Sequence, residues 1–105
     1  MVKVKALFLI PLRDNDGTDL GSLIDELEAS LFANFFGWTL WGTVRGAYLM
    51  KDGTKAVDEN LPYAVFTDES QIENLENMLR AFKLKTKQES IYLEIQHHVE
   101  LRLVQ

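Results

Sequence analysis

Residues 70–82 read SQIENLENMLRAF, and this stretch decides the fold because it holds the most regular helical pattern in the chain. Its apolar side chains recur at intervals of three and four, at Ile72, Leu75, Met78, Leu79 and Phe82. That spacing puts them on one face of a helix. Ser70 and Glu73 have the spacing of a capping box, which predicts that the helix begins there.

Strand patterns flank this helix on both sides. Residues 61–67 precede it, and Pro62 belongs at the strand's start because proline cannot donate a ladder hydrogen bond. Residues 90–104 follow it and alternate apolar with polar side chains along their whole length, which predicts one long strand. The second half of the chain therefore predicts a right-handed strand–helix–strand unit.

The first half repeats this order. Residues 2–12 alternate and then become apolar on both faces, which is typical of a central strand covered on both sides. Residues 20–35 form an apolar helical stripe, with Asp19 or Thr18 as N-cap and Gly37 as the left-handed C-cap. A long strand is predicted at residues 38–50.

Glycines mark the irregular points of the second strand. Gly42 and Gly46 predict a bulge or a close backbone approach. Asp52-Gly53 predicts a type I′ hairpin turn, followed by a connector at residues 55–60. The complete order predicts one α+β domain over residues 1–105: a ferredoxin-like βαββαβ sandwich with an antiparallel sheet in the order 4-1-3-2 and two helices on one face.

Composition excludes several functional classes. The chain of 105 residues has 11 Lys and Arg against 16 Asp and Glu, a net charge of −5, so we expect no nucleic-acid partner. It has no cysteine, which excludes disulfides, thiolate catalysis and cysteine-ligated metals. No stretch approaches the ~20 apolar residues of a membrane span, so we expect a cytoplasmic protein without a membrane partner.

Two features predict a homodimer. The second and last predicted strands are longer than a small domain needs, so the surplus is expected to bend or to pair with another chain. The sheet face without helices carries a large apolar patch, which seldom stays open to water. Its residues are Leu7 and Leu9, or Phe8 and Ile10, with Trp38 or Trp41. Sheet-to-sheet packing and edge-strand exchange both satisfy these features.

One set of side chains has the character of a ligand pocket, with aromatic walls and a few polar groups. The candidate ligand-binding residues are Trp41, Arg45, Tyr92, Glu94 and His98. Their strands lie at opposite edges of the predicted sheet, so they share a cavity only if the sheet curls or a partner closes it. A dimer interface is the stronger interpretation of the same residues. Gln88 and Glu89 form a second candidate, although loops at this position are usually polar.

The sequence predicts no metal site and no cofactor. Residues 14–17 fit a polar turn, because aligning Gly17 with an EF-hand puts leucines at the first and last ligand positions. His97 and His98 would point to opposite faces of a strand and cannot share an ion. His98 with Glu94 and Glu100 could hold a divalent ion with help from a partner chain, but a solvated face is favoured.

Short motifs give a resemblance over most of the chain from Phe36 onward. They are Phe36-Gly37-Trp38-Thr39, Gly46, Asp52-Gly53, Tyr63 and Gln88-Glu89-Ser90-Ile91-Tyr92. The chain resembles a group of small uncharacterised bacterial domains with a ferredoxin-like fold, from whose pattern Trp38 and Tyr48 depart. The resemblance implies this fold and a bacterial origin, and it implies no activity.

Three functions compete. The first is a homodimeric module that binds a small molecule or a protein partner. The second is a cofactor-free enzyme of the dimeric α+β-barrel type, monooxygenase-like or isomerase-like. There His98 would be the catalytic base and Arg45 would stabilise an oxyanion. The third is an accessory subunit of a larger complex. A buried His98 would favour the enzyme, and an exposed one the module.

Overall fold

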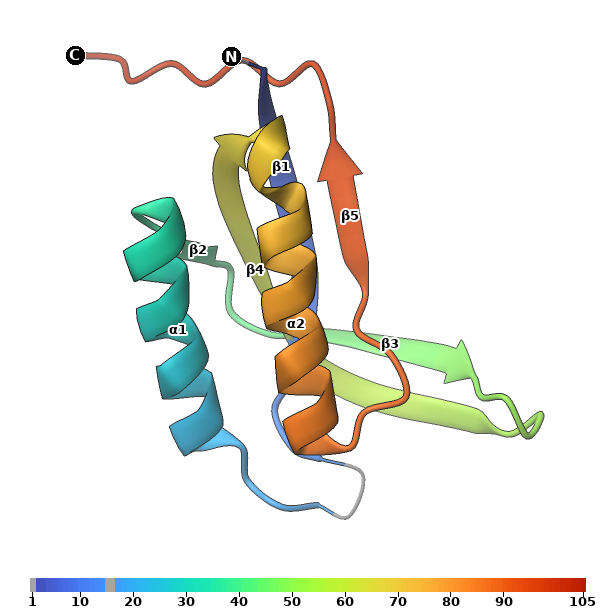
Figure 1. The fold of residues 1–105 in the computed structure, drawn as a ribbon. Coiled ribbons are helices and arrows are strands. Elements are labelled where there is room, and N and C mark those ends of the chain that lie inside the picture. Colours follow the sequence, from blue (N-terminus) through green and yellow to red (C-terminus); the bar gives the residue numbers. More distant parts are fainter. Residues whose placement is uncertain (1, 15–16) are drawn as a thin grey trace.

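The computed structural model describes residues 2–14 and 17–105, and β1 (Lys3–Pro11) is its central strand (Figure 1). Its alternation separates two faces. Val4, Ala6, Phe8 and Ile10 are fully buried toward the helices. The intervening residues, Leu7 and Leu9 among them, are half-buried on the other side, called the open face below. The expectation that this strand is covered on both sides is therefore wrong, because both helices pack on one face.

The two helices bury the stripes that the sequence predicts. α1 (Gly21–Phe35) and α2 (Ile72–Thr86) lie side by side across the sheet in Figure 1. The buried residues of α1 are Ile24, Leu27, Leu31 and Phe35, and those of α2 are Leu75, Leu79, Phe82 and Thr86. Together with β1 and the inner face of the sheet they form one hydrophobic core.

The helix ends differ from prediction in detail. Asp19 Oδ1 accepts the Gly21 N–H at 2.7 Å, so this side chain does satisfy the start of α1. The predicted capping box does not form, because a 3₁₀ turn, η1 (Glu69–Gln71), contains Ser70 and α2 begins after it without a side-chain cap. Phe36 (φ 66°), not Gly37, is the left-handed residue after α1, and its N–H bonds to Phe32 O.

All strand pairings are antiparallel, in the order β2-β4-β1-β5. The predicted strand at residues 38–50 is interrupted: β2 (Thr39–Leu40) and β3 (Val44–Leu49) pair with different parts of β4 (Lys55–Asp68). Gly42, with φ 67°, lies in the break. Glycine adopts this left-handed backbone without strain. The irregularity predicted at Gly42 is therefore a complete break between β2 and β3.

A projecting hairpin is the least expected element. β4 begins at Lys55, so the predicted connector at residues 55–60 is a strand paired with β3. Residues 44–59, called the arm below, extend away from the body of the sheet in Figure 1. Gly53 has φ 87° while Asp52 has no positive φ, and Gly53 N–H bonds to Met50 O at 3.0 Å. The turn is therefore a type I turn followed by a left-handed glycine, not type I′.

The last strand is much shorter than predicted. β5 (Leu93–Gln96) pairs with β1 from Lys5 to Phe8, and no strand continues to residue 104. His98 has φ 58°, a left-handed backbone that turns the chain away from the sheet. The alternation of residues 90–104 alone could not show that the chain turns away at His98.

The polar turn predicted at residues 14–17 includes residues 15 and 16, which lie outside the described residues.

One polar contact joins a helix to the centre of the sheet. The buried Tyr63 on β4 donates a hydrogen bond to Glu28 Oε2 on α1 at 2.5 Å. Its ring also stacks on Phe8 and meets the edge of Trp38. Burial, reinforced by the Glu28 carboxylate, raises the pKa of the Tyr63 hydroxyl well above its ordinary value.

No helix of the described residues is long and apolar enough to cross a membrane.

The raised Tyr63 pKa predicts a loss of stability at alkaline pH. The unfolded tyrosine releases its proton near pH ~10, whereas the folded one holds it. The contribution is therefore complete below that pH and is lost as pH rises toward the folded pKa. We expect Tyr63→Phe to flatten this part of a chemical-denaturation pH profile. Tyr48→Phe, at an exposed tyrosine, is the control. Equal steepness in wild type and Tyr63→Phe would contradict the assignment.

Candidate functional site

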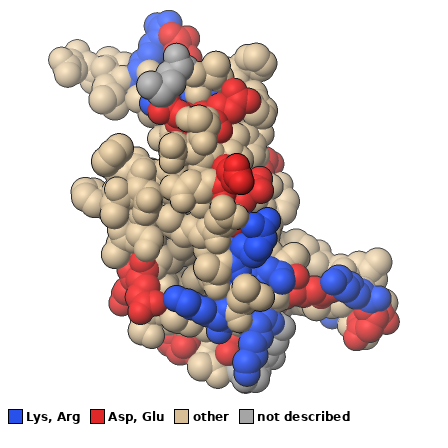
Figure 2. Space-filling view, viewed as in Figure 1, with Lys and Arg blue, Asp and Glu red and all other residues tan. Residues whose placement is uncertain are grey.

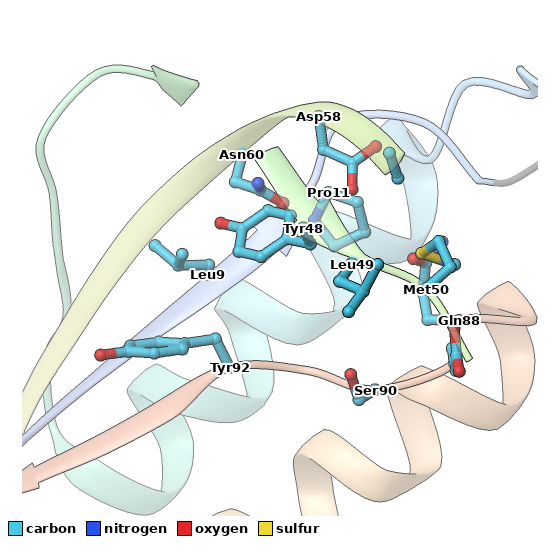
Figure 3. A pocket seen from close by; sticks show the side chains of 12 residues that line it. Leu9, Pro11, Tyr48, Leu49, Met50, Asp58, Asn60, Gln88, Ser90 and Tyr92 are labelled. Atoms are coloured by element: carbon cyan, nitrogen blue, oxygen red, sulfur yellow. The ribbon is translucent and has the colours of Figure 1, made fainter. Parts of the chain in front are cut away.

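A cavity of about 320 Å³ lies where the arm leaves the sheet. Three parts of the chain line it: the end of β1, the arm with the adjoining Asn60, and the segment between α2 and β5. Figure 3 shows the side chains converging from these separate elements. Its volume is at the lower end of the range of small-molecule sites, about 300–1,000 Å³. We call it the arm cavity.

Backbone contacts hold the three walls together. Leu9 N–H bonds to Tyr92 O at 3.2 Å, which fixes the approach to β5 against β1. Leu12 N–H bonds to Glu59 O at 3.4 Å, which ties the base of the arm to the end of β1. Lys51 Nζ lies 3.8 Å from Glu89 Oε1 and links the arm's turn to the opposite wall. The cavity is therefore shaped by the tertiary arrangement of the arm.

Two tyrosine side chains lie on opposite sides of the arm cavity. Figure 3 shows Tyr48, from β3, above the space and Tyr92, from the segment before β5, below it. Leu9 and Pro11 of β1 form the apolar back of the cavity. Paired aromatic rings of this kind provide flat, weakly polar surfaces for a planar ligand.

Gly46 makes the position of the Tyr48 ring possible. The two residues share one face of β3, since they are two apart on a strand. A Cβ on Gly46 would lie only 2.8 Å from Tyr48 Cζ, so the ring occupies the space that a side chain would take. The glycine thus has a role in shaping the cavity.

The polar lining includes two carboxylates. Asp58 on the arm and Glu89 in the loop before β5 both line the cavity. Lys51 is the cation paired with Glu89, and its own side chain is 88% exposed at the rim. Asn60, Gln88 and Ser90 add neutral donors and acceptors. This arrangement favours a ligand with hydrogen-bonding edges and a positive charge.

A hydrogen-bonded row continues from the cavity along β5. The Tyr92 hydroxyl donates to Glu94 Oε1 at 3.0 Å, and Gln96 Nε2 donates to Glu94 Oε2 at 2.8 Å. The bond from Gln96, with that from Tyr92, lowers the pKa of the Glu94 carboxyl. The same bond to Glu94 raises the pKa of the Tyr92 hydroxyl. Glu94 therefore remains ionised and holds the Tyr92 side chain at the edge of the cavity.

The structure brings together two of the five predicted ligand-binding residues, Tyr92 and Glu94. Trp41 lies beyond the end of β2, with Lys5 Nζ 4.9 Å from its ring centre. Arg45 stands opposite Glu59 in the arm, on the other face of β3 from Tyr48. His98 is exposed beyond the end of β5. None of these three lines the arm cavity as described.

Sequence reasoning missed the arm's contribution. The sequence predicts Tyr48 in a strand and places Asp58 and Asn60 in a connector, because the charged residues 55–60 do not look like a strand. It indicates Glu89 only as part of the weaker candidate site. The spacing of Gly46 and Tyr48 was the available signal, since glycine beneath an aromatic ring on one strand face indicates close packing. Among the described residues, no group of three His, Cys, Asp or Glu side chains is placed to hold a metal ion.

Comparison with known proteins gives a structural likeness. No protein-family model and no curated protein sequence matches the chain. Among solved structures, it is similar to a phage SAM lyase in complex with S-methyl-5′-thioadenosine, with a TM-score of 0.71 and 14% sequence identity. The match covers 90% of this chain and 81% of the other. At this identity the likeness shows the mixed α+β fold alone.

Proposed function

We propose that this domain is a small-molecule-binding module whose arm cavity takes an adenosine bearing a sulfur substituent, in the class of SAM and S-methyl-5′-thioadenosine. The observation that carries the proposal is that Tyr48 and Tyr92 lie on opposite sides of a cavity whose lining includes two carboxylates. The likeness to a SAM lyase, whose structure holds S-methyl-5′-thioadenosine, supports this ligand class.

The cavity matches the two parts of such a ligand. A purine is flat and stacks on tyrosine, and its edges bond to amide and hydroxyl groups such as those of Asn60 and Ser90. The sulfonium of SAM is a cation, and it would be attracted both by carboxylates and by the faces of aromatic rings. Asp58 and Glu89 supply the carboxylates. We therefore expect SAM to bind more tightly than the neutral thioether.

Isothermal titration calorimetry tests the proposal directly. The purified chain is titrated with SAM, with S-methyl-5′-thioadenosine and with adenosine. We expect binding of the first two, with SAM the tighter, and weaker binding of SAM at high salt because screening reduces the charge term. Absence of heat with all three ligands, together with unchanged Tyr fluorescence, would reject this ligand class.

Breakdown of the ligand is a second candidate function. The observation that favours it is the position of Asp58 and Glu89 in the cavity, since a carboxylate can act as a general base. It would take a proton from a water whose oxygen attacks the sulfonium-bearing carbon of the amino acid chain. The C–S bond then breaks, its electron pair stays on the sulfur of S-methyl-5′-thioadenosine, and the second product is homoserine. Chromatography of SAM incubated with the chain would detect release of S-methyl-5′-thioadenosine above the rate without protein.

In contrast, the His98-based mechanism is disfavoured, because His98 is exposed and lies outside the cavity.

We further propose that the fold is ferredoxin-like and that the protein is cytoplasmic. If β2 and β3 count as one interrupted strand, the order β5-β1-β4-β2 corresponds to the 4-1-3-2 order of a ferredoxin-like domain. The position of both helices on one face of the sheet supports this assignment. We infer a location in the bacterial cytoplasm. This compartment is reducing, and a chain without cysteine needs no disulfide for its stability.

A further inference from the structure

The C-terminal residues 97–105, called the tail below, have the pattern of a strand but pair with none. The apolar residues Val99, Leu101 and Leu103 alternate with polar ones. Leu101 is 52% exposed and Leu103 is 83% exposed. Among the strand pairings of the described residues, none involves the tail. In Figure 1 it crosses above the ends of the strands rather than running beside one, and in Figure 2 it projects from the body.

The β2 edge of the sheet is only two residues long, but it carries no charge that would oppose pairing with another strand. β2 is the outermost strand of the order and pairs with β4 on one side. Natural edge strands usually carry lysine, proline or other charges against unwanted pairing. Residues 29–44, which contain β2, have no Asp, Glu, Lys or Arg. Figure 2 shows the surface over the C-terminal end of α1 without these charges.

Exposed aromatic residues surround this edge. Phe32 is 64% exposed, Phe36 is 85% exposed and Trp41 is 51% exposed. A surface that is rich in aromatic residues and depleted of charge has the composition of an interface core. The domain thus presents two unsatisfied surfaces, an apolar strand-like tail and an apolar sheet edge.

We propose that the tail of one copy adds as a strand to the β2 edge of a second copy of this chain. Both surfaces have unpaired backbone hydrogen-bonding groups and exposed apolar side chains. Strand addition would pair the backbone groups and bury the apolar side chains. The occupant is a second copy because donor and acceptor occur on the same chain, at opposite ends of the sheet order. Reciprocal exchange closes a dimer, and successive exchange closes a ring.

Charge does not oppose this contact despite the net charge of −5. Arg102 Nη2 lies 2.8 Å from Glu100 Oε1, so the two charges of the tail neutralise each other. Residues 29–44 at the β2 edge carry none, and the Lys5 ammonium lies over the Trp41 ring at 4.9 Å from its centre. Apart from Glu100, which is paired with Arg102, the acidic residues therefore lie outside the two surfaces that would meet.

Native mass spectrometry tests the proposal with variants on each side of the contact. We expect the unmodified protein at the mass of two or more chains, each of 12.1 kDa. Leu101→Asp in the tail and Phe36→Asp at the edge should each shift the mass to that of one chain, at least at low concentration. Both side chains are at least half exposed, so the substitutions spare the core. Leu84→Asp, at a 71% exposed leucine on α2, is the matched control and should leave the assembly unchanged.

Cross-linking separates a second copy from the chain's own edge. The chain has no cysteine, so Leu101→Cys and Thr39→Cys can be made as separate proteins and mixed. Disulfide formation between the two proteins supports the proposal. Overturning results are a single-chain mass for the wild type, an assembly that survives both Asp variants, or a disulfide that forms only when both cysteines are in one chain. Ligand binding is measured separately, so its failure does not affect this test.

Discussion

Phe8→Ala is expected to lower the free energy of unfolding by about 3–5 kcal/mol, the range for truncating a buried aromatic residue. Phe8 is fully buried at the centre of β1, and its ring lies 5.8 Å from that of Tyr63 with an interplanar angle of 13°. Its loss would leave a cavity between the sheet and both helices. Because small domains are stable by only about 5–15 kcal/mol, this one change removes a large part of the total.

Urea denaturation followed by circular dichroism measures this effect. Leu84→Ala is the control, since Leu84 is 71% exposed and its truncation is expected to change stability by no more than about 0.5 kcal/mol. Similar midpoints for Phe8→Ala and wild type would show that β1 is not the centre of the core.

Tyr48→Ala is expected to weaken binding of SAM by about fivefold to 150-fold, since stacking of a base on an aromatic ring contributes roughly 1–3 kcal/mol. Tyr48 is 39% exposed and lies on the arm, so its removal should leave the core intact. Val57→Ala is the matched control, because Val57 is on the arm but does not line the cavity. Calorimetric titration of both variants gives the comparison.

Gly46→Ala tests whether SAM binding depends on the position of the Tyr48 ring and not only on its presence. The added Cβ would displace the Tyr48 ring, which currently lies over the glycine. We expect weaker binding in the wild-type background and no further loss in the Tyr48→Ala background. Additive losses in the double variant would mean that Gly46 acts independently of the ring.

Local patterns were sufficient for the elements that form the core. The stripe from Ile72 to Phe82 predicted α2, and the alternation of residues 2–12 predicted β1, because burial of apolar side chains against one core imposes these periods. The Asp-Gly pair at residues 52–53 correctly placed the hairpin turn. Tyr92 and Glu94 were recognised as neighbours since they are two apart in one extended segment.

Features that depend on contacts across the chain could not be predicted in the same way. The arm appears as charged connector sequence, yet residues 55–60 are a strand because β3 pairs with them. The capping box at Ser70 is replaced by a 3₁₀ turn. Residues 97–104 keep a strand's alternation without a strand, because His98 turns the backbone away from β1. Alternation describes what a segment can bury, not whether a partner is beside it.

The sequence by itself determined two amphipathic helices, a central apolar strand, and an acidic chain without cysteine, since these follow from periodicity and composition. Only the tertiary structure decided where the second strand breaks, that the arm projects, and that Tyr48, Asp58, Glu89 and Tyr92 line one cavity. The physical reason is that hydrophobic patterning acts over a few residues. A site assembled from β1, the arm and the approach to β5 depends on pairings between residues distant in sequence, which no local pattern specifies.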